Sequence, residues 1–175
     1  ITTWEWGTYF DSKLKVEGIK LNISKWRRPA PNTIPWDTKA AGLYMICTLS
    51  KHEAEKQGYT DSLMLDHEGY VAEATGANIF FKDKEGNLHT PIPDCFLDGI
   101  TRRTVIEIAK SKKIKVIERK IKPDELSNFI GCFLTGTAAE VTPVSQIDKF
   151  NFKVCSTIID LSESYQSKVR KKIAA

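Results

Sequence analysis

Polar and apolar residues alternate in the segment 18–24, which is typical of a β-strand with one buried face, whereas 130–134 is a nearly unbroken apolar run typical of a fully buried strand. The first 24 residues are expected to be rich in strand, with one strand ending at 9–10. The other strands predicted in this half of the chain are 18–24, 62–66, 70–73, 78–82 and 88–90. Because only short turns separate the strands from residue 62 onward, we expect local antiparallel pairing among them.

Apolar residues recur at helical spacing in several other stretches. The predicted helices are about 40–57, 101–113, 123–128 and 156–172. Asp37 or Thr38 is the expected cap of the first helix, and Gly58 ends it. The last helix has five apolar residues near one face, which are Ile158, Ile159, Leu161, Tyr165 and Val169. Strands are predicted between the later helices at 114–120, 130–134 and 141–147.

Composition is that of an ordinary globular protein. Of 175 residues, 41% are hydrophobic and 27% charged, so we predict a single domain over 1–175 with a full core. The net charge of +4 is too small to indicate a nucleic-acid partner, and no apolar run approaches the ~20 residues of a membrane span.

The four cysteines lack metal-ligand spacing, so we predict no metal site and a cytoplasmic protein with reduced thiols. We also expect further sequence before Ile1.

Four places carry residues suited to chemistry. Lys39 lies in the proline-rich segment 29–44, at the entry to a helix, which suits a covalent role. Glu73 ends a strand of apolar neighbours, where a carboxylate needs a partner; the alternative is an ion pair with a nearby arginine. Residues 99–101 enter a helix whose free N–H groups suit a phosphate, and simple N-capping is the alternative. Small residues and two hydroxyls at 135–139 suit a ligand close to the backbone, or an ordinary tight turn.

A lysine, a carboxylate and two phosphate-type loops together suit the cofactor pyridoxal 5′-phosphate (PLP). The lysine amine bonds covalently to the aldehyde of the cofactor. A carboxylate beside the pyridine nitrogen keeps that nitrogen protonated, so that the ring can accept electrons. The sequence therefore indicates PLP as a candidate cofactor.

Several motifs stand in a fixed order along the chain. They are Trp6-Gly7-x-Tyr9, Trp26-x-Arg28, Pro31-Asn32-Thr33-Ile34-Pro35 followed by Lys39-Ala40-x-Gly42-x-Tyr44, Glu73-Ala74-x-x-x-Asn78-Ile79-Phe80, Gly99-Ile100-Thr101-Arg102, and Gly136-Thr137-Ala138-Ala139-Glu140-Val141-Thr142-Pro143. In this order and at these spacings, the chain resembles, from about Trp4 to Asp148, the large C-terminal domain of the branched-chain amino acid aminotransferases. These are PLP enzymes of fold type IV. The resemblance implies a mixed α and β fold, in which a mixed sheet forms a pseudo-barrel flanked by helices.

The resemblance also implies roles for the residues that contact the cofactor. Lys39 matches the catalytic lysine, which bonds to PLP and then moves a proton between the substrate Cα and the cofactor. Glu73 matches the carboxylate at the pyridine nitrogen. Tyr44 matches the tyrosine that hydrogen-bonds the phenolic oxygen, with core packing as its alternative. Ile100 and Thr101 match the phosphate site, which Thr137 closes from the other loop.

Substrate contacts are implied in the same way. The backbone amides of Thr137 and Ala138 match the site of the substrate α-carboxylate. Trp6 and Tyr9 resemble the aromatic walls of the substrate pocket, with surface or core packing as their alternative. Arg28 resembles a support for these groups rather than a reacting residue.

The implied function is ping-pong transamination between branched-chain L-amino acids and 2-oxoglutarate. The relatives form homo-oligomers, dimers or multiples of dimers, so we expect the same here. Their small N-terminal domain is absent from this chain, so impaired cofactor retention is expected. After Asp148 the sequence FNFKVCS replaces the glycine-rich turn of the relatives. Three alternatives remain, namely a D-amino acid aminotransferase, an aminodeoxychorismate lyase and a non-catalytic domain.

Overall fold

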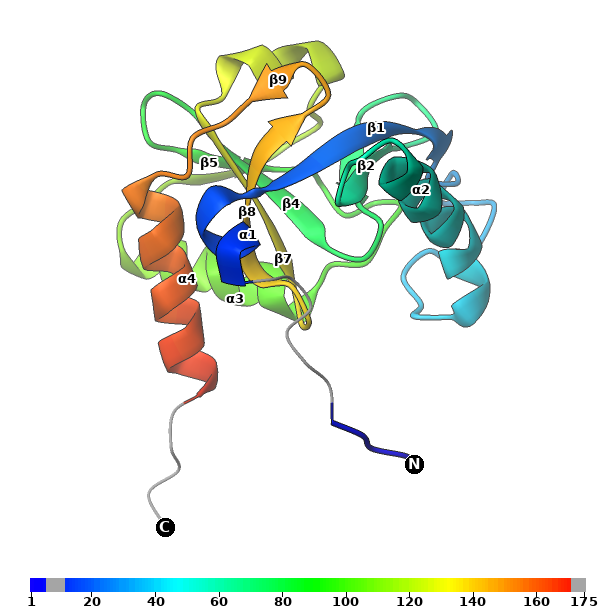
Figure 1. Ribbon diagram of the computed structural model, residues 1–175, viewed down its shortest axis with the longest axis horizontal. Coiled ribbons are helices and arrows are strands. Elements are labelled where there is room, and N and C mark those ends of the chain that lie inside the picture. The colour runs from blue at the N-terminus through cyan, green and yellow to red at the C-terminus, as the bar shows by residue number, and fades with distance from the viewer. Residues whose placement is uncertain (6–11, 171–175) are drawn as a thin grey trace.

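The computed structural model describes residues 1–5 and 12–170, and within these residues a nine-stranded mixed sheet forms the centre of the molecule (Figure 1). Its strands are β1 (Ile19–Arg27), β2 (Asp61–Leu65), β3 (Val71–Ala74), β4 (Asn78–Lys82), β5 (Leu88–Thr90), β6 (Val116–Glu118), β7 (Gly131–Gly136), β8 (Glu140–Ile147) and β9 (Phe150–Asn151). The helices are α1 (Ser12–Glu17), α2 (Met45–Lys56), α3 (Ile100–Ser111) and α4 (Ser156–Val169), with 3-10 helices η1 (Ala41–Tyr44) and η2 (Pro123–Asn128).

The strand order shows how the sheet closes. It is β3-β2-β1-β8-β7-β4-β5-β6, with β9 paired to β8. β1 is parallel to both β2 and β8, β5 is parallel to β6, and the other pairs are antiparallel. β3 and β4 are not neighbours in this order, yet they lie in contact, and the Ala74 N–H donates to the Ala77 carbonyl (2.8 Å). The sheet therefore curls back on itself, which confirms the expected mixed pseudo-barrel.

The central strands are buried on both faces. Successive side chains of a strand point to opposite faces, so neighbouring phenylalanines on β4 join different clusters. Phe80 stacks on Phe133 of β7, with ring centroids 5.0 Å apart, in the cluster that includes α3 and α4. Phe81 stacks on Phe129 after η2, also at 5.0 Å, in the cluster on the opposite face. The unbroken apolar runs of β4 and β7 follow from this double burial.

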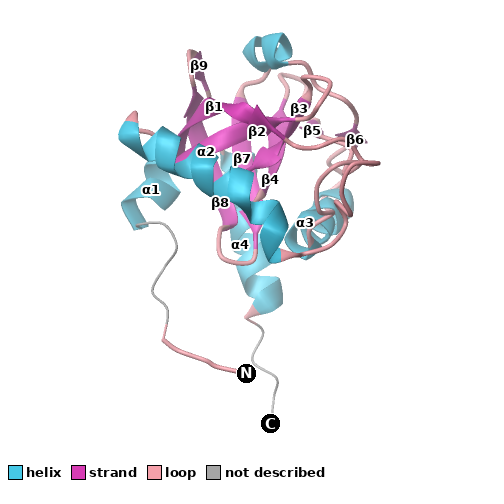
Figure 2. Cartoon of the chain, turned by 90° about the vertical axis from the view of Figure 1, so that its right-hand side faces the viewer, coloured by secondary structure: helices cyan, strands magenta, loops and turns pink. Residues whose placement is uncertain are grey.

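The helices lie on different sides of the sheet. α2 contacts β1 and β2, whereas α3 and α4 contact each other and the β7–β8 pair. Figure 1 shows α2 at the right and α4 at the left, and in Figure 2 α2 runs across the sheet in front of it. In the part of the chain that the structure describes, no helix has the length and apolar character needed to cross a membrane.

The beginning of the chain differs from the prediction. The expectation of strand throughout the first 24 residues is wrong for Ser12–Glu17, which form α1. This segment is rich in leucine, lysine and glutamate, which favour helix, and Leu14 packs against the core. The strand expected to end at 9–10 falls outside the described residues.

The predicted cap of the first long helix is also wrong. The helix begins as η1, and its N-cap residue is Ala40 rather than Asp37 or Thr38. Ala40 makes no side-chain hydrogen bond to the helix start. The Thr38 hydroxyl instead donates to the Pro35 carbonyl (2.7 Å). A local turn therefore uses the hydroxyl that was expected at the helix start.

Strand pairing and the face of α4 were predicted in part. Local antiparallel pairing is confirmed for β2–β3 and β4–β5, but β4 pairs with β5 and β7 rather than with β3.

On α4, Ile158, Leu161 and Tyr165 are buried, whereas Ile159 and Val169 are about half exposed. The buried face of α4 is thus narrower than predicted.

Candidate active site

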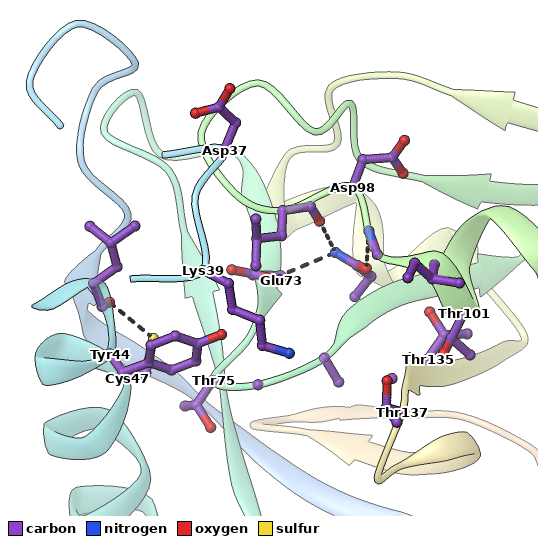
Figure 3. A pocket seen from close by; sticks show the side chains of 18 of the residues that line it. Asp37, Lys39, Tyr44, Cys47, Glu73, Thr75, Asp98, Thr101, Thr135 and Thr137 are labelled. Carbon is purple, nitrogen blue, oxygen red and sulfur yellow. Dashed lines mark hydrogen bonds between the residues drawn. The ribbon is translucent and has the colours of Figure 1, made fainter. Parts of the chain in front are cut away.

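A cavity of about 270 Å³ lies where four segments that are distant in sequence meet (Figure 3). These segments are the loop and helix start at 28–47, the β3–β4 turn at 73–78, the entry to α3 at 97–101 and the end of β7 at 135–137. Six residues predicted as catalytic or cofactor-binding line the cavity, and they are Lys39, Tyr44, Glu73, Ile100, Thr101 and Thr137. The fold therefore gathers the predicted cofactor contacts in one place.

Lys39 and Tyr44 come from the same short stretch. Lys39 is exposed on the loop before η1, and Figure 3 shows its side chain extending into the cavity beside Tyr44. Tyr44 ends η1 and precedes the first turn of α2. Burial raises the pKa of the Tyr44 phenol, and Glu73 and Cys47 add to that rise while Arg28 opposes it. The phenol therefore stays protonated and can donate a hydrogen bond into the cavity.

Glu73 on β3 is a buried acid with one cation beside it. Its Oε1 lies 3.5 Å from the Nε of Arg28, and its Oε2 lies 3.5 Å from the Nδ2 of Asn78. Burial raises the pKa of Glu73 to about 8, although Arg28 lowers it. The arginine foreseen as the alternative partner of Glu73 therefore lies beside it, within the same cavity as Lys39.

Arg28 holds its position through contacts on several sides. Besides Glu73, it donates from Nε to the Cys95 carbonyl (3.4 Å) and from Nη1 to the Cys47 sulfur (3.4 Å). Arg28 is almost fully buried. It thus places a fixed positive charge behind the carboxylate, which fits the supporting role expected for it.

The start of α3 forms the other end of the cavity. Its first turn presents Ile100, which is exposed, and Thr101, which is buried. The first N–H groups of a helix lack partners within the helix and carry the positive end of its dipole, so they favour an anion. Thr137 lines the same cavity from the turn after β7. The start of α3 and Thr137 can therefore bind the oxygens of an anionic group from two sides of the cavity.

Asn78 and Thr135, which also line this cavity, were not assigned a role from the sequence, although Thr135 is one of the two hydroxyls noted at 135–139. Asn78 donates from Nδ2 to the Leu97 carbonyl (2.9 Å), and its Oδ1 accepts from the Gly99 N–H (3.2 Å). It thereby links the Glu73 end of the cavity to the start of α3. Thr135 on β7 is buried, and its hydroxyl has no hydrogen-bond partner among the described residues. Asn78 stands in the same motif as Glu73, but only the folded turn shows which groups it joins.

The predicted substrate contacts are placed less fully. Ala138 is exposed and is not among the residues that line the cavity, although Thr137 before it is. Trp6 and Tyr9 lie outside the described residues. The substrate side of the site therefore stays a prediction.

The order and placement of these residues agree with a comparison against known families. The sequence profile described as amino-transferase class IV matches residues 1–147. The chain belongs to the class IV aminotransferases. Over 137 residues it is 50% identical to a probable branched-chain-amino-acid aminotransferase of Rickettsia bellii, an alignment that covers 78% of this chain and 47% of that protein. All four segments that line the cavity lie within the residues that the class IV profile matches.

Solved structures give the same result for the fold. A crystal structure of the T.th. branched-chain amino acid aminotransferase with pyridoxamine 5′-phosphate superposes with a TM-score of 0.89 at 38% identity, over 95% of this chain and 55% of that one. A second structure of that enzyme, complexed with N-(5′-phosphopyridoxyl)-L-glutamate, gives 0.87 at 37% identity, over 95% and 54%. The fold type IV architecture is thus confirmed. The chain spans about half the length of the relatives it matches.

Proposed function

We propose that the protein containing this chain moves amino groups between branched-chain L-amino acids and 2-oxoglutarate, with PLP as its cofactor. One observation carries the proposal: Lys39, Tyr44, Glu73 and the start of α3 line a single cavity in a chain of the class IV family. The relatives named as branched-chain aminotransferases support the substrate class.

The residues present fit PLP in chemistry. The cavity offers an amine for the aldehyde, a phenol for the ring oxygen, a carboxyl for the ring nitrogen and a helix start for the phosphate. The buried Thr135 hydroxyl, which has no partner in the described chain, fits a site that is completed by a polar ligand. When bound, PLP supplies an aldehyde that takes up amino groups and a ring that withdraws electrons from the substrate.

Each residue then has a defined task. The Lys39 amine holds the cofactor and afterwards accepts and returns the proton at the substrate Cα. Glu73 binds the ring nitrogen, and two cations beside it, that nitrogen and Arg28, favour the carboxylate form. Tyr44 donates to the phenolic oxygen. Ile100, Thr101 and Thr137 hold the phosphate.

The substrate contacts extend this proposal. The backbone amides of Thr137 and Ala138 hold the α-carboxylate, and Trp6 and Tyr9 form apolar walls for the side chain. The glutamyl adduct in the T.th. enzyme supports 2-oxoglutarate as the acceptor. Both substrates then use one site in turn, which is ping-pong transamination. We also propose that the protein works as a homo-oligomer and that 1–175 form its large domain.

Reduction with borohydride tests the covalent role. The chain is mixed with PLP, reduced and digested, and we expect the pyridoxyl group on Lys39. Lys39→Arg is expected to abolish this label, whereas Lys84→Arg, in the exposed β4–β5 turn, leaves it in place. Labelling that is spread over surface lysines and persists in Lys39→Arg contradicts the proposal.

A substrate panel then tests the reaction in the complete protein. We expect amino transfer from L-valine to 2-oxoglutarate. A preference for D-alanine or for aminodeoxychorismate would instead identify one of the other activities considered from the sequence. A labelled Lys39 without any turnover would favour a non-catalytic domain.

A further inference from the structure

A hydroxyl pair joins α4 to the anion-binding end of the cavity. The Thr101 Oγ1 lies 3.3 Å from the Tyr165 Oη, and either oxygen can donate. Thr101 is 4% exposed and Tyr165 8% exposed. Thr101 lines the cavity, whereas Tyr165 stands behind it, packed among the apolar residues of α3, α4, β4, β7 and β8.

The direction of this hydrogen bond follows from counting protons. Two hydroxyls joined by one bond leave a single O–H free to donate further. If Thr101 donates, the Tyr165 proton is left in an apolar, buried place, which is costly. If Tyr165 donates, the Thr101 proton is left on the cavity side, where an anion can accept it. The second arrangement is favoured whenever an anion occupies the cavity.

The hydroxyl of Thr101 is also engaged differently from its neighbour in the same helix. Thr104 donates to the Ile100 carbonyl (2.9 Å), the usual bond of a helical threonine to the turn before it. Thr101 has Tyr165 as its partner instead, so its oxygen faces across to α4. Tyr165 therefore sets the orientation of the Thr101 hydroxyl.

α4 is held firmly enough to serve this purpose. Ser162 donates to the Val141 carbonyl (3.4 Å), and Arg170 forms an ion pair with Glu140. Both acceptors lie on β8, just after the turn that carries Thr137. One helix thus contacts both sides of the anion-binding end, the start of α3 and the start of β8.

We propose that Tyr165 is a positioning residue for the phosphate group of the cofactor, acting through the Thr101 hydroxyl. This role rests on the proposed function. α4 begins after residue 147, where the family match ends, so the match assigns no task to this helix. The long Oη–Oγ1 distance indicates a modest contribution, of the size of one neutral hydrogen bond.

The test compares PLP with pyridoxal, which has the same ring and aldehyde but no phosphate. We expect Tyr165→Phe in the complete protein that contains this chain to raise the dissociation constant for PLP about three- to ten-fold, measured by absorbance titration. The dissociation constant for pyridoxal stays unchanged. Tyr59→Phe, which removes a phenol that does not line the cavity, is the matched control and leaves both constants unchanged.

A second variant separates a positioning role from a structural one. In a Thr101→Val background, Tyr165→Phe is expected to have no further effect on PLP binding, because its hydroxyl acts through Thr101. Equal losses for PLP and pyridoxal, or the same loss in both backgrounds, would overturn the role. An unchanged Tyr165→Phe variant, in a chain that binds PLP, would overturn it as well. Failure of the complete wild-type protein to bind PLP at all would instead overturn the proposed function, and this role with it.

Discussion

At the scale of single residues, the environment of Glu73 sets the character of the site. Its carboxyl is buried with one cation, Arg28, at 3.5 Å, and one amide, that of Asn78, at the same distance. These contacts do not compensate for the lost hydration of the carboxylate, so the pKa of Glu73 rises to about 8. A second positive group in the cavity would therefore be bound favourably, which is what a protonated ring nitrogen offers.

Glu73→Gln is expected to flatten part of the pH dependence of stability in the ligand-free chain. The pKa of this carboxyl is about 8 in the folded chain, against an ordinary value of 4.5. Between these values the folded chain keeps a proton that the unfolded chain has lost, so the free energy of unfolding falls as pH rises. The contribution of Glu73 to the free energy of unfolding is fully present below its ordinary pKa of 4.5. It is lost as pH rises through about 8, and the free energy of unfolding falls by up to ~1.4 kcal/mol per pH unit.

Urea unfolding at several pH values between those two limits measures this slope. Glu85→Gln, in the exposed turn between β4 and β5, is the control and keeps the wild-type slope. If Glu73→Gln also keeps that slope, the carboxyl of Glu73 titrates at its ordinary value and the physical account of the site is wrong.

At the scale of elements, the start of α3 is set by one side chain from another element. Asn78 accepts from the Gly99 N–H and donates to the Leu97 carbonyl, so it fixes the backbone just before the helix. The backbone angles of Gly99 (φ −62°, ψ 143°) suit any residue. Glycine is required at this position for a steric reason, because a Cβ there would lie 2.4 Å from the Asn78 Oδ1.

Gly99→Ala is expected to destabilise the chain by about 1–3 kcal/mol and to weaken anion binding at the start of α3. Asn78 can make room only by giving up its bonds to Leu97 and Gly99, which moves the helix start. Gly42→Ala is the matched control, since no atom lies within 4 Å of a Cβ at that position. Urea unfolding and titration with PLP measure the two effects. Equal behaviour of both variants would show that Asn78 does not constrain this turn.

At the scale of the whole molecule, the curl of the sheet makes the cavity. β1 lies between β2 and β8, and β7 lies between β8 and β4, so segments distant in the sequence become neighbours. The cluster inside the curl holds this arrangement. Phe81 on β4 is fully buried there and contacts Phe129 (5.0 Å between ring centroids) and Phe152 (6.2 Å).

Phe81→Ala is expected to lower the free energy of unfolding by about 3–5 kcal/mol, because it removes a buried ring and leaves a cavity between β4, η2 and β9. Phe150→Ala, at a half-buried position on β9, is the comparison and should cost clearly less. Urea unfolding at one pH measures both. A loss below about 1 kcal/mol for Phe81→Ala would contradict the structural role given to this cluster.

Residues that meet in the cavity could be named from the sequence, because each stands in a recognisable local pattern, while their roles toward a cofactor stay a proposal. Lys39 lies on the loop five residues before Tyr44, which ends η1, whereas Glu73 lies near the end of β3 and Thr101 in the first turn of α3. These placements follow from local patterns of turn, strand and helix residues, whereas the choice of Tyr44 as a site residue rested on the family resemblance. Most strands and helices were predicted for the same reason, within a few residues at their ends.

The tertiary structure alone decided how these pieces meet. The parallel pairing of β1 with β2 and β8 runs through backbone hydrogen bonds, which look alike for many sequences, so local patterns could not reveal it. The Asn78 bridge and the contact of Tyr165 with Thr101, 64 positions away in the chain, depend on that pairing. The sequence by itself determined which groups are available for chemistry. Their distances, burial and shared partners were decided by packing, because only the closed sheet brings distant segments within hydrogen-bonding range and excludes water from between them.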